Sequence, residues 1–248
     1  MSRRNAPGTI PRVLDGLRTK IYADGADLET MLELAKNPRI AGFTTNPTLM
    51  RNSGVRDYEG FARAVLEAVT DHPISFEVFA DEPEEITRQA RLIAAWAPNV
   101  YVKVPVTTTS GEPLTEVVRR LSGDGVQVNV TAVFTLEQVE KVTAALRDGA
   151  ASNISVFAGR IADAGVDPVP VVRDALAIMA DAPRSACIWA SPREILNLLQ
   201  ANQVGCHIIT MTKDLLAKLG SLGKDLETFS LETVQMFRRD AQAAGFAL

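Results

Sequence analysis

The chain has 248 residues, of which 46% are hydrophobic and 23% are charged, as in ordinary globular proteins. Its 26 basic and 30 acidic side chains give a formal net charge of −4, so no basic surplus indicates a nucleic acid or an anionic membrane as partner. No stretch approaches the ~20 consecutive apolar residues of a membrane helix. Residues 1–8 lack the apolar run of a secretory signal, and we expect a cytoplasmic protein.

The cysteines and histidines do not indicate a metal site. Cys187 and Cys206 stand in apolar contexts far apart in the sequence, which is typical of buried thiols in a reducing compartment. His72 and His207 have no partner at a metal-ligand spacing, so we expect both to be structural or exposed. A zinc enzyme is therefore not expected.

Short apolar strands alternate with amphipathic helices along the chain. The first strand ends at Asp24, and Asp27 is well placed to cap the helix that follows. The expected strands span residues 20–23, 40–44, 74–79, 99–106, 126–131, 153–157, 185–190 and 206–210. The expected helices span residues 27–36, 57–69, 82–96, 113–122, 136–146, 169–179, 193–201 and 213–219, with a last helix at 231–243.

This alternation predicts one α/β domain built from right-handed βαβ units with a parallel sheet. Eight units in about 200 residues favour a single closed (β/α)8 TIM barrel with an extra C-terminal helix. An open doubly wound sheet is less suitable, because no Gly-x-Gly-x-x-Gly follows the first strand. We expect a tail and lead-in at residues 1–18 and the barrel domain, including the last helix, at residues 19–248.

Lys103 lies inside an almost wholly apolar, β-branched strand. Lysine is rarely buried, because taking an unpaired ammonium out of water is costly. Two interpretations follow from the local pattern. The side chain can reach water at the strand end, or its amine can be held in an apolar pocket, where the free amine is a nucleophile able to form a Schiff base.

Polar residues at other strand ends bear on that choice, because the active site of such a barrel lies at the C-terminal ends of its strands. Asp24 could cap a helix, but Asp27 already fits that role. Asn46 precedes a proline and could simply initiate a turn. Glu77 within an apolar strand indicates either function or a buried ion pair. Asn129 and Thr131 alternate with valines, so one set faces a barrel interior that is normally apolar.

A second group of polar residues follows the sixth and seventh strands. Ser155 and Phe157 end the sixth strand and Arg160 follows, while Ser191 and Arg193 follow the seventh. Either arginine alone could belong to the solvated surface. Together, on neighbouring strands, they favour an anionic substrate group such as a phosphate.

Seven segments resemble the motifs of the transaldolase family, in unbroken order over roughly residues 20–215. They are Ala23-Asp24 with Asp27, Gly42 to Thr48, Ile74 to Val78, Val102 to Pro105, Val128 to Thr131, Ser155 to Arg160, and Ala190 to Arg193. The chain lacks the long insertions of the larger members. It is therefore similar to the compact subfamily that includes the fructose 6-phosphate aldolases.

The resemblance implies a role for each candidate residue. Lys103 would form a Schiff base with the C2 carbonyl of a ketose phosphate, and Asp24 would be the general acid/base. Glu77 and Thr131 would hold a water, with the Lys103 amine facing the barrel mouth and reaching Glu77 through that water. The implied substrate-binding residues are Thr45, Asn46, Ser75, Asn129, Ser155 and Phe157, with Arg160, Ser191 and Arg193 at the phosphate. The lysine cation is the electron sink, so no metal or organic cofactor is implied.

Two positions favour a transferase over an aldolase. Compact aldolases that resemble this chain carry glutamine at Glu77 and tyrosine at Phe157. Pro192 stands where the family often has an aromatic residue, which changes the expected acceptor pocket.

The alternatives are aldolase-type cleavage of fructose 6-phosphate, a specialised transaldolase making an unusual sugar phosphate such as an octulose phosphate, and a catalytically silent sugar-phosphate-binding barrel. The resemblance also implies a homo-oligomer, pentameric or decameric, in which the C-terminal helix reaches a neighbouring subunit.

Overall fold

The computed structural model describes residues 12–246, which form two compact units. The barrel unit comprises residues 18–216, and the terminal unit comprises the described residues 12–17 and 217–246. The first eleven residues of the expected N-terminal tail lie outside the described residues. The terminal unit contains the short 3-10 helices η1 (Arg12–Gly16) and η2 (Ala217–Ser221) and the helix α11 (Leu226–Ala243). The assignment of α11 to the barrel domain stays a prediction.

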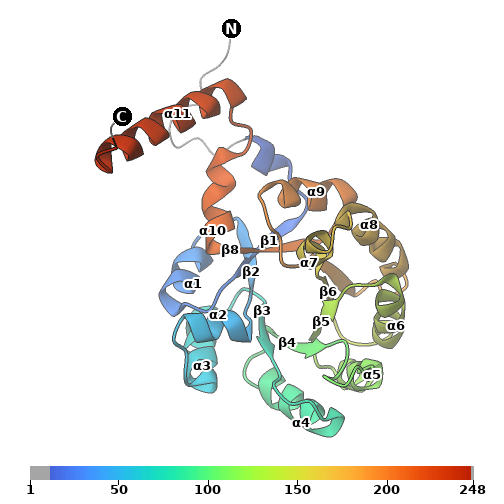
Figure 1. Ribbon diagram of the computed structural model, residues 1–248. Coiled ribbons are helices and arrows are strands. Elements are labelled where there is room, and N and C mark those ends of the chain that lie inside the picture. The colour runs from blue at the N-terminus through green and yellow to red at the C-terminus, as the bar shows by residue number, and fades with distance from the viewer. Residues whose placement is uncertain (1–11, 247–248) are drawn as a thin grey trace. The chain divides into compact units, whose positions relative to one another are not determined.

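The barrel unit is a closed sheet of parallel strands that follow one another in sequence order (Figure 1). The strands are β1 (Lys20–Asp24), β2 (Ile40–Thr44), β3 (Ile74–Glu77), β4 (Val100–Pro105), β5 (Val128–Val133), β6 (Ser152–Val156), β7 (Ser185–Trp189) and β8 (Ile208–Thr212). The predicted (β/α)8 barrel is therefore confirmed.

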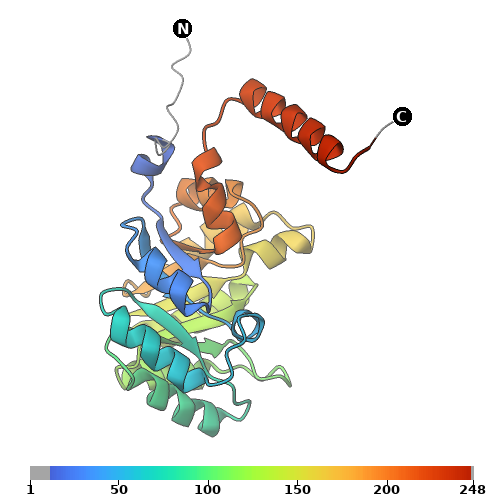
Figure 2. The ribbon, with the colours of Figure 1, turned by 90° about the vertical axis from the view of Figure 1, so that its left-hand side faces the viewer.

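Helices surround the strands on the outside of the barrel (Figures 1 and 2). They are α1 (Leu28–Ala35), α2 (Pro47–Asn52), α3 (Tyr58–Ala68), α4 (Pro83–Ala94), α5 (Thr115–Gly123), α6 (Leu136–Leu146), α7 (Ala158–Asp163), α8 (Pro168–Met179), α9 (Leu196–Val204) and α10 (Lys213–Leu216). Within the described range 12–246, no helix combines the length and the apolar character needed to cross a membrane.

Side-chain caps explain why several helices begin where they do. Asp27 accepts a hydrogen bond from the Thr30 backbone N–H, and Asp57 accepts one from the Gly60 N–H. Thr135 forms a reciprocal capping box at the start of α6. Each cap satisfies a backbone donor that has no partner within the helix, so these starts could be predicted from the sequence.

Two short helices, α2 and α7, are not among the helices predicted from the sequence. Each has six residues, which is too short for a 3.6-residue apolar period to show in the sequence. Helix α2 is nevertheless well specified, because Asn46 caps it through the Leu49 N–H at 2.9 Å and Pro47 occupies its first position. The helix α11 also begins five residues earlier than predicted, since Asp225 caps it.

Alternation along the strands separates the hydrophobic core from the inside of the barrel. Val102 and Val104 on β4 are completely buried, and Lys103 between them points to the opposite face. The same alternation occurs on β5, where Val128 and Val130 flank Asn129. The apolar side chains pack beneath the helices, and the polar ones meet inside the barrel.

Candidate active site

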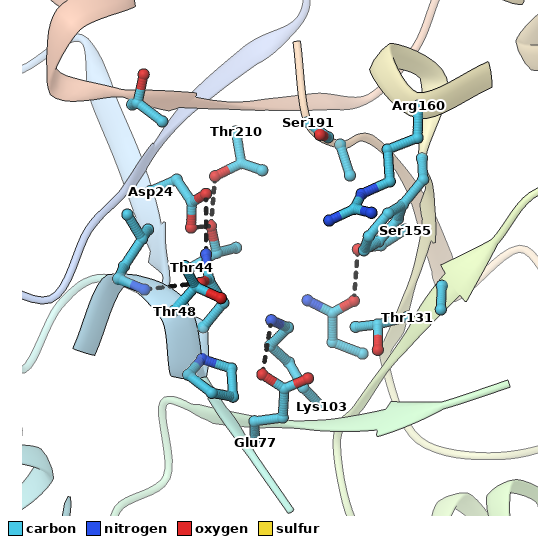
Figure 3. A pocket seen from close by; sticks show the side chains of 18 of the residues that line it. Asp24, Thr44, Thr48, Glu77, Lys103, Thr131, Ser155, Arg160, Ser191 and Thr210 are labelled. Atoms are coloured by element: carbon cyan, nitrogen blue, oxygen red, sulfur yellow. Dashed lines mark hydrogen bonds and ion pairs between the residues drawn. The ribbon is translucent and has the colours of Figure 1, made fainter. Parts of the chain in front are cut away.

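A cavity of about 490 Å³ opens at the C-terminal ends of the barrel strands. The predicted site residues that line it are Asp24, Asn46, Glu77, Lys103, Asn129, Thr131, Ser155, Phe157, Arg160, Ser191 and Arg193. Figure 3 shows side chains from different parts of the barrel converging on one space, among them Asp24, Glu77, Lys103, Thr131, Ser155, Arg160 and Ser191. Thr45 and Ser75, the remaining predicted substrate-binding residues, are buried and do not line the cavity.

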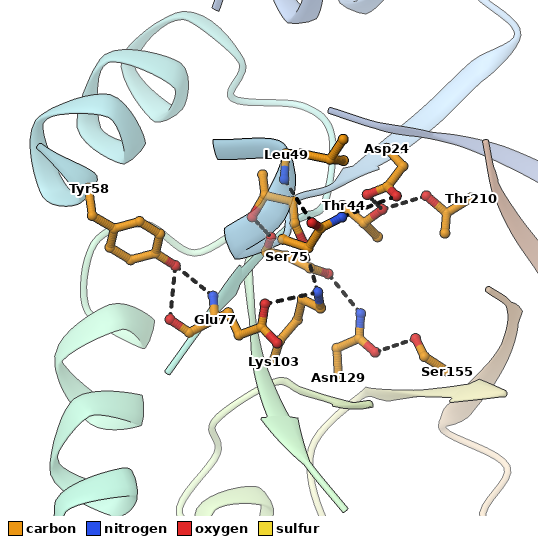
Figure 4. A network of polar contacts seen from close by, with 12 residues as sticks. Asp24, Thr44, Leu49, Tyr58, Ser75, Glu77, Lys103, Asn129, Ser155 and Thr210 are labelled. Carbon is orange, nitrogen blue, oxygen red and sulfur yellow. Dashed lines mark hydrogen bonds and ion pairs between the residues drawn. The ribbon is translucent and has the colours of Figure 1, made fainter. Parts of the chain in front are cut away.

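Lys103 faces this cavity and is only 8% exposed. Its Nζ donates to the Thr45 carbonyl oxygen at 2.7 Å and lies 3.3 Å from Oε2 of Glu77 (Figure 4). The contact with Glu77 is direct, so the expectation of one intervening water is wrong for this structure. The register of the sheet explains it, because Glu77 and Lys103 are paired across β3 and β4 and their side chains emerge next to each other.

Asp24 provides a second carboxyl group in the cavity. Burial raises the pKa of Asp24, and the nearby charge of Lys103 and a hydrogen bond from Thr44 oppose that rise. Thr44 Oγ1 donates to Oδ1 of Asp24 at 2.9 Å, and the amide of Asn46 lies 3.5 Å from Oδ2. A carboxyl group whose pKa is raised can still bind and release a proton at a pH where an ordinary aspartate is fully ionised, and this suits general acid/base chemistry.

Thr44 and Thr210 belong to the same site but were not among the predicted residues. Their hydroxyl oxygens lie 2.5 Å apart, and both residues line the cavity beside Asp24. Thr44 is the last residue of β2, and Thr210 lies between the apolar Ile209 and Met211 in β8. The rule that singled out Asn129 would therefore have found both, had it been applied to every polar strand end.

A buried chain of hydrogen bonds crosses the floor of the cavity. Asn129 donates from Nδ2 to Ser75 Oγ at 3.0 Å, and its Oδ1 accepts from Ser155 Oγ at 2.7 Å (Figure 4). Thr45 donates to the Ser75 carbonyl at 2.8 Å. Thr45 and Ser75 therefore lie behind the cavity wall, where they hold the residues that face it.

Another part of the cavity wall carries Arg160 and Arg193. Arg160 on α7 lies over the ring of Phe157, with 5.9 Å between the guanidinium carbon and the ring centroid. Arg193 hydrogen-bonds the carboxylate of Asp163, a residue that was not among the predicted site residues. No local signal connects Asp163 with Arg193, because they lie 30 positions apart.

Close backbone packing brings this wall together. Gly159 donates its N–H to the Ala190 carbonyl at 3.3 Å, and a Cβ at Gly159 would lie 1.6 Å from the Ser191 carbonyl oxygen. Only glycine permits this approach of α7 to the segment after β7. Ser191 itself has a φ of +60°, an uncommon conformation for a residue with a side chain. Figure 3 shows Arg160 and Ser191 on the same side of the cavity.

The cysteines and histidines are not among the residues that line this cavity. Cys187 and Cys206 are both buried, and the Cys187 N–H donates to Nδ1 of His207. His72 contacts the Ile40 carbonyl through Nε2. Among residues 12–246, no group of three His, Cys, Asp or Glu side chains is arranged to hold a metal ion.

Comparison with solved structures gives the same fold. A HpcH/Hpal aldolase/citrate lyase family protein from Burkholderia cenocepacia superimposes with a TM-score of 0.54 and 16% identity, covering 92% of this chain and 97% of that one. A thiamine phosphate pyrophosphorylase from Pyrococcus furiosus gives a TM-score of 0.53 at 12% identity, covering 82% and 88%. At this identity the likeness concerns the barrel alone.

Sequence comparison is more specific. The model of the family described as "Transaldolase/Fructose-6-phosphate aldolase" matches residues 21–248. A "Probable transaldolase" of Dehalococcoides mccartyi is 34% identical over 81% of this chain and 89% of its own length. A "Probable transaldolase" of Herpetosiphon aurantiacus is 31% identical over 88% and 96%, respectively. The chain belongs to the transaldolase/fructose-6-phosphate aldolase family of enzymes.

Proposed function

We propose that the protein transfers a dihydroxyacetone unit from a ketose phosphate to an aldose phosphate through a Schiff base on Lys103. The observation that carries the proposal is a lysine amine at the cavity wall, next to the Glu77 carboxylate and in the same cavity as Asp24. Among protein side chains, a lysine amine can join a ketone as an iminium ion and then accept the electrons of a breaking carbon–carbon bond.

The reaction begins when Nζ of Lys103 adds to the C2 carbonyl of the donor. Loss of that oxygen as water gives an iminium ion, with Glu77 and Thr131 as the groups that hold the departing water. Asp24 removes the proton of the C4 hydroxyl, the C3–C4 bond breaks, and its electron pair moves onto the iminium nitrogen. The first aldose leaves and the three-carbon enamine remains bound to Lys103.

The second half runs the same steps in reverse on the acceptor. The enamine carbon attacks the aldehyde of the acceptor, Asp24 returns its proton to the new hydroxyl, and water releases the product from Lys103. The buried Ser75–Asn129–Ser155 chain supports a role for Asn129 in orienting the dihydroxyacetone hydroxyls, since its amide is held by two hydrogen bonds. Arg160, Ser191 and Arg193 are the proposed phosphate contacts.

Trapping with borohydride tests the covalent step. Incubation with fructose 6-phosphate and borohydride should add the mass of a reduced dihydroxyacetone unit to the wild-type chain. The Lys103→Ala variant should gain none. An equal adduct on this variant would contradict the Schiff base on Lys103. A catalytically silent barrel would instead show ligand-induced stabilisation with no adduct on the wild type.

Product analysis separates transfer from cleavage. We favour transfer because Glu77 and Phe157, rather than glutamine and tyrosine, line the cavity. With an acceptor present, the expected product is a new ketose phosphate, and free dihydroxyacetone without an acceptor would indicate an aldolase. Pro192 also lines the cavity and favours testing erythrose 4-phosphate and ribose 5-phosphate side by side, because a larger product would identify a specialised transaldolase.

A further inference from the structure

The backbone of Glu77 loses its strand partner on one side. Strands β2 and β3 pair only at Phe43 with Ile74 and at Thr44 with Ser75. Beyond Thr44 the chain turns away into α2, so β2 does not reach the level of Glu77. On the other side the ladder continues, because the Val78 N–H donates to the Lys103 carbonyl at 3.2 Å. The N–H and C=O of Glu77 point away from β4 and require another partner.

One tyrosine hydroxyl satisfies both of these groups. The Tyr58 hydroxyl oxygen accepts from the Glu77 N–H at 2.6 Å, and the hydroxyl donates to the Glu77 carbonyl at 2.9 Å (Figure 4). Tyr58 is the first residue of α3, directly after the Asp57 cap. The hydroxyl therefore takes the place of a neighbouring strand at the position where β3 carries its carboxylate.

The ring that carries this hydroxyl is held in place by other aromatic rings. Its centroid lies 4.6 Å from that of Phe79 in an edge-on arrangement, 5.8 Å from Trp96 and 6.2 Å from Phe76. Burial raises the pKa of Tyr58, so the hydroxyl keeps the proton that it donates. The Tyr58 hydroxyl can therefore both donate and accept a hydrogen bond at any pH at which an enzyme normally works.

We infer that Tyr58 is a positioning residue, which holds the end of β3 so that the Glu77 carboxylate lies against the Lys103 amine. The inference rests on the role proposed for Glu77 in the Schiff-base reaction. Tyr58 does not line the cavity, so its effect reaches the reaction only through Glu77. The position of the carboxylate determines where the water of dehydration and hydrolysis is held.

A double-mutant cycle tests this coupling. Tyr58→Phe removes the hydroxyl and keeps the ring, and we expect kcat to fall on the order of tenfold with KM unchanged, since misplacing a reacting group mainly affects the chemical step. In a Glu77→Gln background the same change should alter kcat less than about twofold. Trp96→Phe is the matched control: it alters the aromatic cluster, keeps the hydroxyl, and should leave kcat within about twofold of the wild type.

Three results would overturn the inference. They are a wild-type kcat for Tyr58→Phe, an equal loss for Tyr58→Phe with and without Glu77→Gln, and an equal loss for Trp96→Phe. A crystal structure of Tyr58→Phe measures the positioning without any reaction. We expect the direct contact between Lys103 and Glu77 to be lost, and an unchanged contact would contradict the inference. Absence of a trapped adduct on the wild type would instead overturn the proposed function, and the crystal structure would still decide the role of Tyr58.

Discussion

The guanidinium of Arg193 contacts both carboxylate oxygens of Asp163, at 2.9 and 3.1 Å from Nε and more closely from Nη2. Hydrogen bonds from Arg193 hold the pKa of Asp163 below its usual range, so the carboxylate stays charged. Nη1 of Arg193 makes none of these contacts with Asp163. One edge of the guanidinium is thus held by the protein, and its other edge is free to meet the proposed phosphate.

Asp163→Asn should tighten the binding of an anion at this wall. The substitution removes a negative charge beside Arg160 and Arg193. It also weakens the hydrogen bonds that hold one edge of the Arg193 guanidinium against residue 163. We expect inorganic phosphate to inhibit about two- to fivefold more strongly, with a smaller difference at high ionic strength, as for other exposed charges. Weaker inhibition would mean that Asp163 acts by orienting Arg193 rather than by competing with the phosphate.

Asp24→Asn should change how stability depends on pH. Burial raises the pKa of Asp24 above its ordinary value of 3.8, so the folded state holds this proton more tightly than the unfolded chain does. The free energy of unfolding therefore decreases as the pH rises from about 3.8 towards the raised pKa of Asp24. Above that pKa, Asp24 is charged in the folded state and its destabilising effect has reached its full size. Asp24→Asn should remove this slope and raise the melting temperature at pH 7, while transfer is lost.

Thermal melts between pH 4 and 8 measure this effect, with Asp27→Asn as the control. A hydrogen bond from Thr30 lowers the pKa of Asp27, so its contribution has the opposite sign: it is present above the ordinary value and lost as the pH falls. Because asparagine also caps helices, Asp27→Asn should not raise the melting temperature at pH 7. An unchanged slope in Asp24→Asn would show that Asp24 is not the group responsible.

Gly159→Ala should disrupt the wall that carries Arg160 and Ser191. The new methyl group would lie 1.6 Å from the Ser191 carbonyl oxygen, so one of the two backbone segments must move. We expect a loss of roughly 1–3 kcal/mol in the free energy of unfolding and weaker phosphate binding. Gly123→Ala is the matched control, because a Cβ there meets nothing within 4 Å apart from its chain neighbours and the backbone of its own helix. Denaturant unfolding of both variants measures the difference, and equal stabilities would contradict the close packing.

Phe157→Tyr should shift the balance from transfer towards cleavage. The substitution adds a hydroxyl to the cavity wall, as the resemblance to compact aldolases implies. That hydroxyl can protonate the bound enamine before an acceptor arrives, so free dihydroxyacetone should increase relative to transfer product. Product masses measured at equal conversion test this ratio. An unchanged ratio would show that Phe157 does not determine the outcome, and Phe134→Tyr, at the ring 5.6 Å away, controls for a hydroxyl placed further out.

Much of the fold follows from interactions within a few residues of the chain. The Asp27 and Asp57 caps and the apolar strand that contains Lys103 depend on near neighbours, so they could be predicted. The meeting of polar strand ends could also be predicted, because all strands of a parallel barrel end at the same rim. Helix α7 could not, since six residues show no period and its start depends on the contact between Gly159 and Ala190. Helix α2 is equally short, and only the Asn46 cap and Pro47 mark its start in the sequence.

The sequence by itself determined the order of strands and helices and the residue types that the rim would carry. Only the tertiary structure decided which of those residues touch. Lys103 meets Glu77 across 26 positions because of the β3–β4 register, and Tyr58 meets Glu77 because β2 ends too early to pair there. Register and strand length depend on how the whole sheet closes. The sequence of one strand alone does not say which residue of a neighbouring strand it will meet, so these contacts could be assigned only from the folded barrel.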